Sequence, residues 1–214
     1  EPLGPVYLGS EFSDEEIRAF LDAEGVEYRK LERGELLETV ARWIAEDKVV
    51  GWYQGRSEWG PRALGNRSIL ANPTLPTMKD TINTKIKRRE SFRPFAPSVL
   101  KEAVGTYFEQ TVDSPFMMHV VKIRPEGRER LPAVTHVDGT GRLQTVERDN
   151  NPLYYQLINA FRRKTGVALV LNTSFNENEP VVDSPEQAFD CFRRTDIDAL
   201  CLGRYVLMKK WSAT

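Results

Sequence analysis

The sequence has few cysteines and histidines. Only two of each occur in 214 residues: Cys191, Cys201, His119 and His136. Both cysteines lie in apolar surroundings, which is typical of buried thiols in a reducing compartment rather than of a disulfide framework. Two histidines without a cysteine pairing do not make a structural zinc site, so we expect no metal bound by the protein's own side chains.

The sequence also lacks a long apolar run. No stretch approaches the roughly 20 residues that span a bilayer, and no signal peptide is visible. We therefore expect a cytoplasmic protein with no membrane contact. With 40% hydrophobic and 29% charged residues, the composition is that of an ordinary globular chain. The length suits one large domain better than two. Because Glu1 is not an initiator methionine, we expect a piece of a longer polypeptide.

The net charge is close to zero, but the charges are unevenly distributed. The whole chain carries a formal charge of −1. Between Gln54 and Arg93, nine Lys and Arg residues stand against three acids, so this segment is +6 and the remainder is −7. Concentrated positive charge can attract an anionic ligand. The net-negative remainder argues against a long polyanion such as nucleic acid as the partner.

Helix and strand signals alternate along the chain, which predicts an α/β (α+β) layered domain whose sheet need not be purely parallel. A capping box at Ser13–Glu16 opens the first predicted helix. Gly166 is expected to end the longest one. Helices are predicted at about 14–22, 35–46, 77–88, 152–164 and 185–194, and strands at about 49–53, 117–123, 167–171 and 199–207.

A glycine- and arginine-rich segment, Gln54–Ser68, follows the first predicted strand. Its three glycines let the backbone turn tightly and approach a ligand closely. Arg56, Arg62 and Arg67 lie between and beside them, and guanidinium forks match the oxygens of phosphate and carboxylate groups. The segment is not a Walker A loop, because no Gly-Lys-Ser/Thr follows. A surface loop with solvated arginines is the alternative.

Two further segments carry candidate ligand-binding groups. In Lys85–Pro97, prolines and aromatic residues surround Arg93 and restrict its rotamers, which suits binding; a solvated, basic helix end is the alternative. In Thr135–Val146, a glycine turn brings a histidine, an aspartate and Arg142 together. His136 is a candidate general base or a hydrogen-bonded structural group.

A fourth segment, Leu171–Asn176, comes directly after an all-apolar predicted strand. Ligands of α/β proteins bind at the carboxyl ends of strands. The Asn and Ser side chains at this position can hydrogen-bond a phosphate or the edge of an adenine. An ordinary polar turn would have the same composition.

With these four segments, the chain resembles the C-terminal half of the O-carbamoyltransferases of antibiotic and nodulation-factor biosynthesis. The matching stretches run in order over about residues 35 to 208 and are specific when taken together. The resemblance implies a domain like the YrdC/Sua5 carbamoyl-adenylate-forming proteins, with a twisted mixed sheet and flanking helices. Residues 1–30 are then expected to be a linker and the start of the domain, and residues 31–214 the YrdC-like domain itself.

The resemblance also implies an activity. Carbamoyl phosphate and ATP, with Mg²⁺ on the phosphates, are expected to give carbamoyl adenylate. An N-terminal domain, missing from this chain, would bind a metal and pass the carbamoyl group to an acceptor hydroxyl. Carried over residue by residue, the expected ligand set places Lys87 and Arg93 in the chemistry and four more residues on the substrates: Arg62, Arg142, Asn172 and Ser174.

The chain departs from the family pattern at Asn178, where a glycine is expected before Glu179-Pro180. This change predicts an altered loop beside the site, so Asn176 is left out of the ligand set. Arg56, Arg67 and His136 remain candidate binding residues from the motifs alone. The alternatives are a tRNA-binding or tRNA-modifying YrdC-type module, which would use the same basic segment with salt-dependent affinity, and a non-catalytic docking domain.

Overall fold

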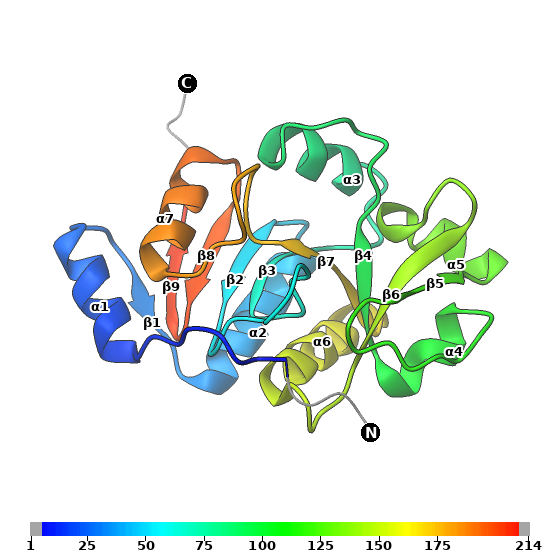
Figure 1. The fold of residues 1–214 in the computed structure, drawn as a ribbon, viewed down its shortest axis with the longest axis horizontal. Helices are drawn as coiled ribbons and strands as arrows, with labels where there is room; N and C mark the ends of the chain where they lie inside the picture. The colour runs from blue at the N-terminus through cyan, green and yellow to red at the C-terminus, as the bar shows by residue number, and fades with distance from the viewer. Residues whose placement is uncertain (1–5, 210–214) are drawn as a thin grey trace.

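The computed structural model describes residues 6–209, and within them nine strands form one mixed sheet (Figure 1). The order across the sheet is β1-β9-β8-β2-β3-β7-β4-β6-β5. The β2–β8 and β4–β6 pairs are parallel, whereas the other pairs are antiparallel. The strands are β1 (Arg29–Lys30), β2 (Val50–Tyr53), β3 (Arg67–Ala71), β4 (Ala96–Leu100), β5 (His119–Lys122), β6 (Thr140–Val146), β7 (Leu169–Ser174), β8 (Ala199–Leu202) and β9 (Tyr205–Met208).

Helices flank this sheet, and the mixed α/β architecture predicted above is confirmed. Figure 1 shows α1 and α7 near one end of the sheet, α4 and α5 near the other, and α2 and α6 near the middle. The helical elements are α1 (Asp14–Ala23), α2 (Arg33–Ala45), α3 (Met78–Thr81), the π-helix η1 (Ile82–Ile86), the 3₁₀ turn η2 (Lys101–Ala103), α4 (Val104–Tyr107), α5 (Pro125–Arg130), the 3₁₀ turn η3 (Pro132–Val134), α6 (Pro152–Thr165) and α7 (Pro185–Arg194).

The predicted helix ends follow from capping. The Ser13 and Glu16 side chains form the expected capping box at α1, and Ser184 with Gln187 forms a second one at α7. Gly166 ends α6 in the left-handed conformation, at φ 73°. These local signals fix the helices that later pack on the sheet.

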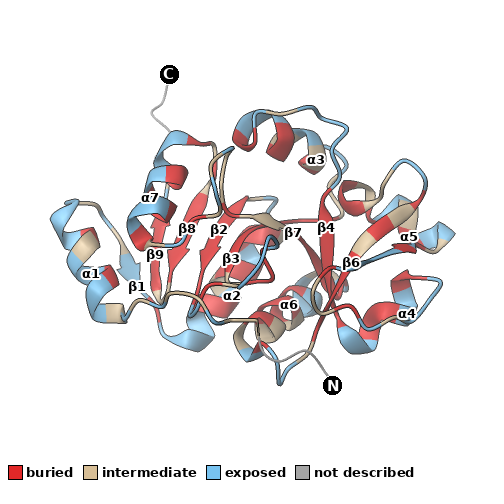
Figure 2. Cartoon of the chain, in the orientation of Figure 1, coloured by how far each residue is buried: buried red, intermediate tan, exposed pale blue. Residues whose placement is uncertain are grey.

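The core lies between the helices and the sheet, where Figure 2 shows nearly continuous burial along the central strands. Helices α2 and α6 pack on each other, and α6 also contacts β4 and β7. Val40 of α2 and Leu157 of α6 are completely buried. Burial of such a side chain contributes about 1.5–3 kcal/mol. Helix α6 therefore supports the central strands β7 and β4 on one face of the sheet.

Several predicted boundaries are corrected by the structure. The single closing strand expected at 199–207 is a hairpin, because Gly203 turns the chain at φ 55° between β8 and β9. The strand expected at 167–171 begins at Leu169 and continues through Ser174, since its antiparallel pairing with β3 extends to that residue. The helix expected at 77–88 is one α-turn followed by a π-turn.

Strands β3 and β4 were not predicted. Strand β3 starts inside the glycine- and arginine-rich segment, and β4 contains Pro97. Pairing with β7 on both sides outweighs these weak local signals. Within residues 6–209, no helix is both long and apolar enough to cross a bilayer.

Candidate active site

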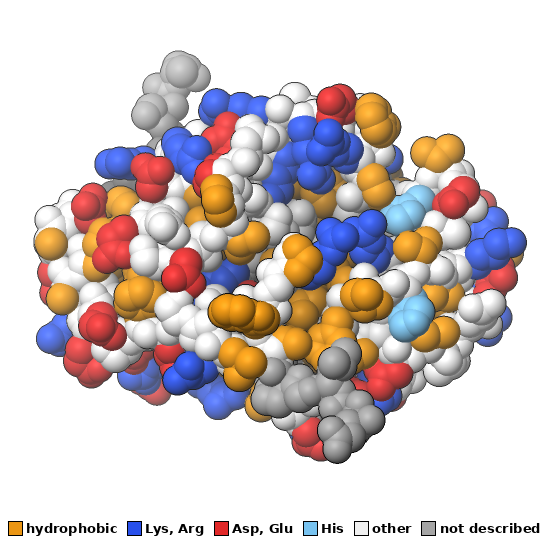
Figure 3. All heavy atoms as spheres, in the orientation of Figure 1, with side chains coloured by type: hydrophobic (Ala, Val, Ile, Leu, Met, Phe, Trp, Pro, Cys, Tyr) orange, Lys and Arg blue, Asp and Glu red, His pale blue; other side chains and the backbone are white. Residues whose placement is uncertain are grey.

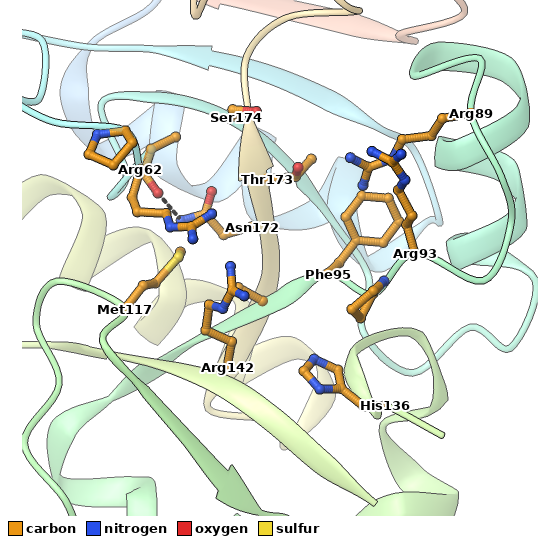
Figure 4. A pocket seen from close by; sticks show the side chains of 14 residues that line it. Arg62, Arg89, Arg93, Phe95, Met117, His136, Arg142, Asn172, Thr173 and Ser174 are labelled. Atoms are coloured by element: carbon orange, nitrogen blue, oxygen red, sulfur yellow. Dashed lines mark hydrogen bonds between the residues drawn. The ribbon is translucent and has the colours of Figure 1, made fainter. Parts of the chain in front are cut away.

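Four arginines converge on one pocket of about 370 Å³ beside the end of β7 (Figure 4). Arg62 comes from the loop between β2 and β3, Arg89 and Arg93 from the segment before β4, and Arg142 from β6. The complete lining is Pro61, Arg62, Ala63, Arg89, Arg93, Pro94, Phe95, Ala96, Met117, His136, Arg142, Asn172, Thr173 and Ser174. Six of the nine predicted site residues thus meet here: Arg62, Arg93, His136, Arg142, Asn172 and Ser174.

The pocket is strongly electropositive, because no Asp or Glu is among its described lining residues. Burial lowers the pKa of the Arg62 guanidinium, and the nearby Arg142 lowers it further. Burial also lowers the pKa of Arg89, and Arg93 adds to that effect. Four guanidinium groups held this close, with Glu90 beside Arg93 as the one acid that pairs with them among the described residues, favour the binding of an anion with several negative oxygens.

The loop that carries Arg62 is shaped by a half-buried network around Glu58. The Glu58 Oε1 atom accepts hydrogen bonds from the backbone N–H groups of Leu64 at 2.6 Å and Asn66 at 2.8 Å. Gly65 has φ 111°, and a Cβ there would lie 2.2 Å from the Tyr154 ring. This position therefore requires glycine. The carboxylate and the glycine together fix a loop that places Arg62 at the pocket.

The segment that carries Arg89 and Arg93 is held by Asn83, which lies in the π-turn. The buried Asn83 side chain donates to the carbonyls of Ser91 at 3.2 Å and Arg93 at 2.9 Å, and its Oδ1 accepts from Arg89 Nε at 2.7 Å. The Arg89 guanidinium also lies over the Phe95 ring, at 5.2 Å from the centroid. Glu90 pairs with Arg93 at 3.0 Å. One asparagine therefore holds two of the four pocket arginines.

Lys87 lies behind the pocket, at 2% exposure, and is not among its lining residues. Its ammonium donates to the carbonyls of Ser174 at 2.6 Å and Asn176 at 2.7 Å, and to Asn176 Oδ1 at 2.6 Å. Burial lowers the pKa of Lys87 to about 7, whereas three oxygen acceptors favour the charged form. Its contacts fasten the end of β7 and the loop that follows; direct contact with a substrate stays a prediction.

The loop after β7 tolerates the departure from the family pattern. Asn178 is not among the described residues with positive φ, so its backbone does not require a glycine. Asn176, which was left out of the predicted ligand set, bonds to Lys87 and accepts from Ser174 Oγ at 2.7 Å. It therefore belongs to the framework of the site.

Two predicted ligand residues lie outside the pocket. Arg67 is completely buried, stacks on the Tyr53 ring at 3.6 Å, and donates to backbone carbonyls, among them Gln54 O at 2.8 Å and Gly55 O at 3.0 Å. Arg56 is exposed and pairs with Glu11 at 3.4 Å. In this structure Arg67 supports the backbone of the loop, whereas Arg56 lies on the side of the loop that faces solvent.

His136 lies at the rim of the pocket, where its Nδ1 atom is 3.0 Å from Thr140 Oγ1. Burial lowers the pKa of its imidazole; Arg142 and Lys79 act in the same direction and Asp138 opposes them. The lowered pKa favours the neutral ring, which can hydrogen-bond a ligand without adding charge.

An apolar cleft of about 800 Å³ adjoins the arginine pocket and shares Pro61, Arg62, Met117 and Arg142 with it. Trp59 and Met118 in this cleft are each 75% exposed. Figure 3 shows Lys and Arg side chains gathered at the centre of this face beside a band of apolar ones. The joined cavities suit a ligand with an anionic end and an apolar end.

The sequence motifs did not single out the residues that hold the pocket in shape. Glu58 and Asn83 act on backbone groups, and their partners become visible only in the folded chain. Arg89 has a partial signal, because it lies in the same basic run as Lys87. Ser98 is buried and had no signal beyond its polarity, whereas Gln144, also buried, lay in the candidate segment Thr135–Val146 without being chosen as a site residue.

Comparison with known proteins places this arrangement in a family. Residues 41–209 match the family described as Carbamoyltransferase C-terminus. The chain is 50% identical to nodulation protein NolNO of Sinorhizobium fredii, covering 98% of this chain and 32% of that protein. It is 44% identical to the 3'-hydroxymethylcephem-O-carbamoyltransferase of Amycolatopsis lactamdurans, over 63% of this chain and 25% of that enzyme. The chain thus spans about a third or less of the length of these two curated relatives.

Solved structures of low sequence identity share the fold. The P. abyssi Sua5 structure with L-threonine has a TM-score of 0.59 at 14% identity, covering 82% of this chain and 48% of that one. Full-length HypF, in a phosphate- and nucleotide-bound form, has a TM-score of 0.54 at 17% identity, covering 85% of this chain and 22% of that one. The predicted Sua5-like fold is confirmed. The family match covers most of the chain, and the chain therefore belongs to the carbamoyltransferase C-terminal family.

Proposed function

We propose that this chain binds carbamoyl phosphate and MgATP and forms carbamoyl adenylate from them. Water first cleaves carbamoyl phosphate to carbamate and phosphate. A carbamate oxygen then attacks the α-phosphorus of ATP, forming the C–O–P link as pyrophosphate leaves. An N-terminal region like the one that makes the relatives longer would transfer the carbamoyl group to an acceptor hydroxyl.

The observation that carries the proposal is the convergence of four guanidinium groups in a pocket where none of the lining residues from the described part of the chain, 6–209, is a carboxylate. Carbamoyl phosphate and the ATP triphosphate are dense anions that repel each other in water. Fixed arginines offset that repulsion, and they also stabilise the charge that develops at the α-phosphorus and the leaving pyrophosphate. Because the lining offers no carboxylate to Mg²⁺, the ion would enter with the ATP phosphates and keep its waters.

Replacement of Arg93 by alanine should lower carbamoyl-phosphate-dependent pyrophosphate release by about 100-fold or more, since one preorganised donor contributes about that factor. The measurement is a coupled pyrophosphate assay, with circular dichroism to confirm the fold. Arg56→Ala is the matched control, because it removes an exposed arginine of the same basic segment that lies outside the pocket. Full activity in Arg93→Ala would refute the site assignment.

The isolated chain also allows a direct binding test. Calorimetry should detect both ATP with Mg²⁺ and carbamoyl phosphate. Failure to bind either ligand would support a docking role in place of the proposed activity.

The apolar cleft is the proposed place for the base of ATP. The cleft and the arginine pocket share Arg62 and Arg142, which would bind the phosphates of ATP. The base would then extend into the cleft and stack on the exposed indole of Trp59. Trp59→Ala should weaken ATP binding by about 10-fold, because base–aromatic stacking is worth about 1–3 kcal/mol. Trp59→Phe should retain most of the affinity.

Inorganic tripolyphosphate is the control ligand for this substitution, since it has the anionic part of ATP and no base. Calorimetry should show equal tripolyphosphate affinity in wild type and Trp59→Ala. An equal loss for both ligands would show that Trp59 supports the pocket instead of contacting the base.

A further inference from the structure

A buried polar network lies beneath the arginine pocket, across three neighbouring strands. Asn172 on β7, Ser98 on β4 and Gln144 on β6 are at most 2% exposed. Their positions follow from sheet register: Ser98 pairs with Gln144, and Asn172 pairs with Ala96, two residues before Ser98. All three side chains therefore lie on the same face of the sheet.

Backbone carbonyls fix which way the two amides in this network point. Gln144 Nε2 donates to Leu64 O at 2.9 Å, so its Oε1 faces the network, where it accepts from Ser98 Oγ at 2.5 Å. Asn172 Nδ2 donates to Ala63 O at 3.1 Å and Gln144 Oε1 at 3.0 Å. Since a carbonyl can only accept, neither amide can be turned over without opposing two oxygens.

This orientation leaves the other atom of the Asn172 amide without a donor. Asn172 Oδ1 is buried and has no hydrogen-bond partner among the described residues. Asn172 lines the pocket together with Arg62 and Arg142 (Figure 4). A buried acceptor without a donor is costly, and such groups in native proteins call for an explanation.

We propose that Asn172 Oδ1 accepts a hydrogen bond from the amide NH₂ of the carbamoyl group, and that this contact selects carbamoyl phosphate over other acyl phosphates. The inference rests on the proposed function. The arginines recognise the phosphate, which every acyl phosphate has. Asn172 recognises the N–H group, which a carbamoyl group has and an acetyl group lacks. Gln144 and Ser98 are positioning residues, because they set the direction of the Asn172 amide.

Because Asn172 Oδ1 is buried, a ligand reaches it only when neighbouring side chains move. Arg62 is suited to that movement: it is exposed, and within residues 6–209 its side chain makes no hydrogen bond or ion pair. A phosphate bound by Arg62 would engage a guanidinium that gives up no protein hydrogen bond in moving. Arg62 would then bind the anion, while Asn172, which is held by its own hydrogen bonds, would bind the N–H group.

The test compares carbamoyl phosphate with acetyl phosphate, which has a methyl group in place of NH₂, by calorimetry on the unmodified chain. Carbamoyl phosphate should bind about 10- to 100-fold more tightly, because acetyl phosphate leaves Asn172 Oδ1 unpaired. Equal binding of the two ligands would overturn the inference and leave the anion site standing. Failure to bind either would instead count against the proposed function.

Two variants extend the test beyond the unmodified chain. Asn172→Ala should bring the preference to about 1 by losing affinity for carbamoyl phosphate alone. Gln144→Met should keep the affinity for acetyl phosphate and lower the preference, a change that a merely structural role would not produce. Asn178→Ala, which truncates an exposed asparagine outside the pocket, should keep the full preference. An unchanged preference in folded Asn172→Ala or Gln144→Met would overturn the inference.

Discussion

Lys87→Met should lower the free energy of unfolding by about 3 kcal/mol, which corresponds to a melting temperature about 10 °C lower for a chain of this size. Methionine fills a similar volume but donates no hydrogen bond. The carbonyls of Ser174 and Asn176 and the Asn176 side chain would each lose a donor at the position of Lys87, which is 2% exposed. Thermal denaturation followed by circular dichroism measures the change.

The same variant should also weaken anion binding, because the lost hydrogen bonds fasten the residues that bring Ser174 to the pocket. Lys85→Met is the matched control: it removes an exposed lysine two residues earlier, and its stability should stay within about 0.5 kcal/mol of wild type. A Lys87→Met protein as stable as wild type would contradict the positioning role assigned to this ammonium.

Arg142→Ala should show the opposite pattern, with binding lost and stability kept. Its guanidinium lines the pocket and lies close enough to Arg62 to lower the pKa of that group. Removal of a charge-assisted donor should weaken carbamoyl phosphate binding by about 10- to 100-fold. The melting temperature should be unchanged or slightly higher, since a like-charge repulsion disappears and solvent already screens part of it.

Arg148→Ala is the control for this pair of measurements. Arg148 follows the same strand, but its guanidinium lies over the Tyr155 ring at 5.3 Å, outside the pocket. Its loss should leave binding unchanged. A marked fall in stability for Arg142→Ala, with binding retained, would mean that this arginine supports the fold and not the ligand.

Local signals were enough to predict much of the fold. Capping residues and apolar periodicity located α1, α2, α6 and α7, because these signals act within a few residues. The hairpin of β8 and β9 was missed because both strands are apolar and only Gly203 and Arg204 separate them. Strands β3 and β4 take their conformation from pairing with β7, which is distant in sequence.

The same division holds for the site. Arg62 and Arg93 could be found because guanidinium groups among glycines and prolines are unusual, and the family resemblance supplied Arg142 and Asn172. Arg89 was missed, because it lies in a basic run without such a setting. Whether an arginine binds a ligand or a carbonyl could not be read from the motif: Arg62 and Arg67 are five residues apart, yet one lines the pocket and the other is completely buried. The difference is the Tyr53 ring and the ring of carbonyls around Arg67, which exist only after folding.

The pocket joins two kinds of structure. Asn172, Ser98 and Gln144 lie on paired strands, whereas Arg62, Arg89 and Arg93 lie on connecting segments. Loops accept substitutions and length changes that paired, buried strands do not. During divergence of the family, substitutions in the loops could therefore change how tightly phosphate is bound without altering which acyl group is accepted. A change in acyl preference would instead need a substitution at a buried, hydrogen-bonded residue of a paired strand, and is correspondingly harder to evolve.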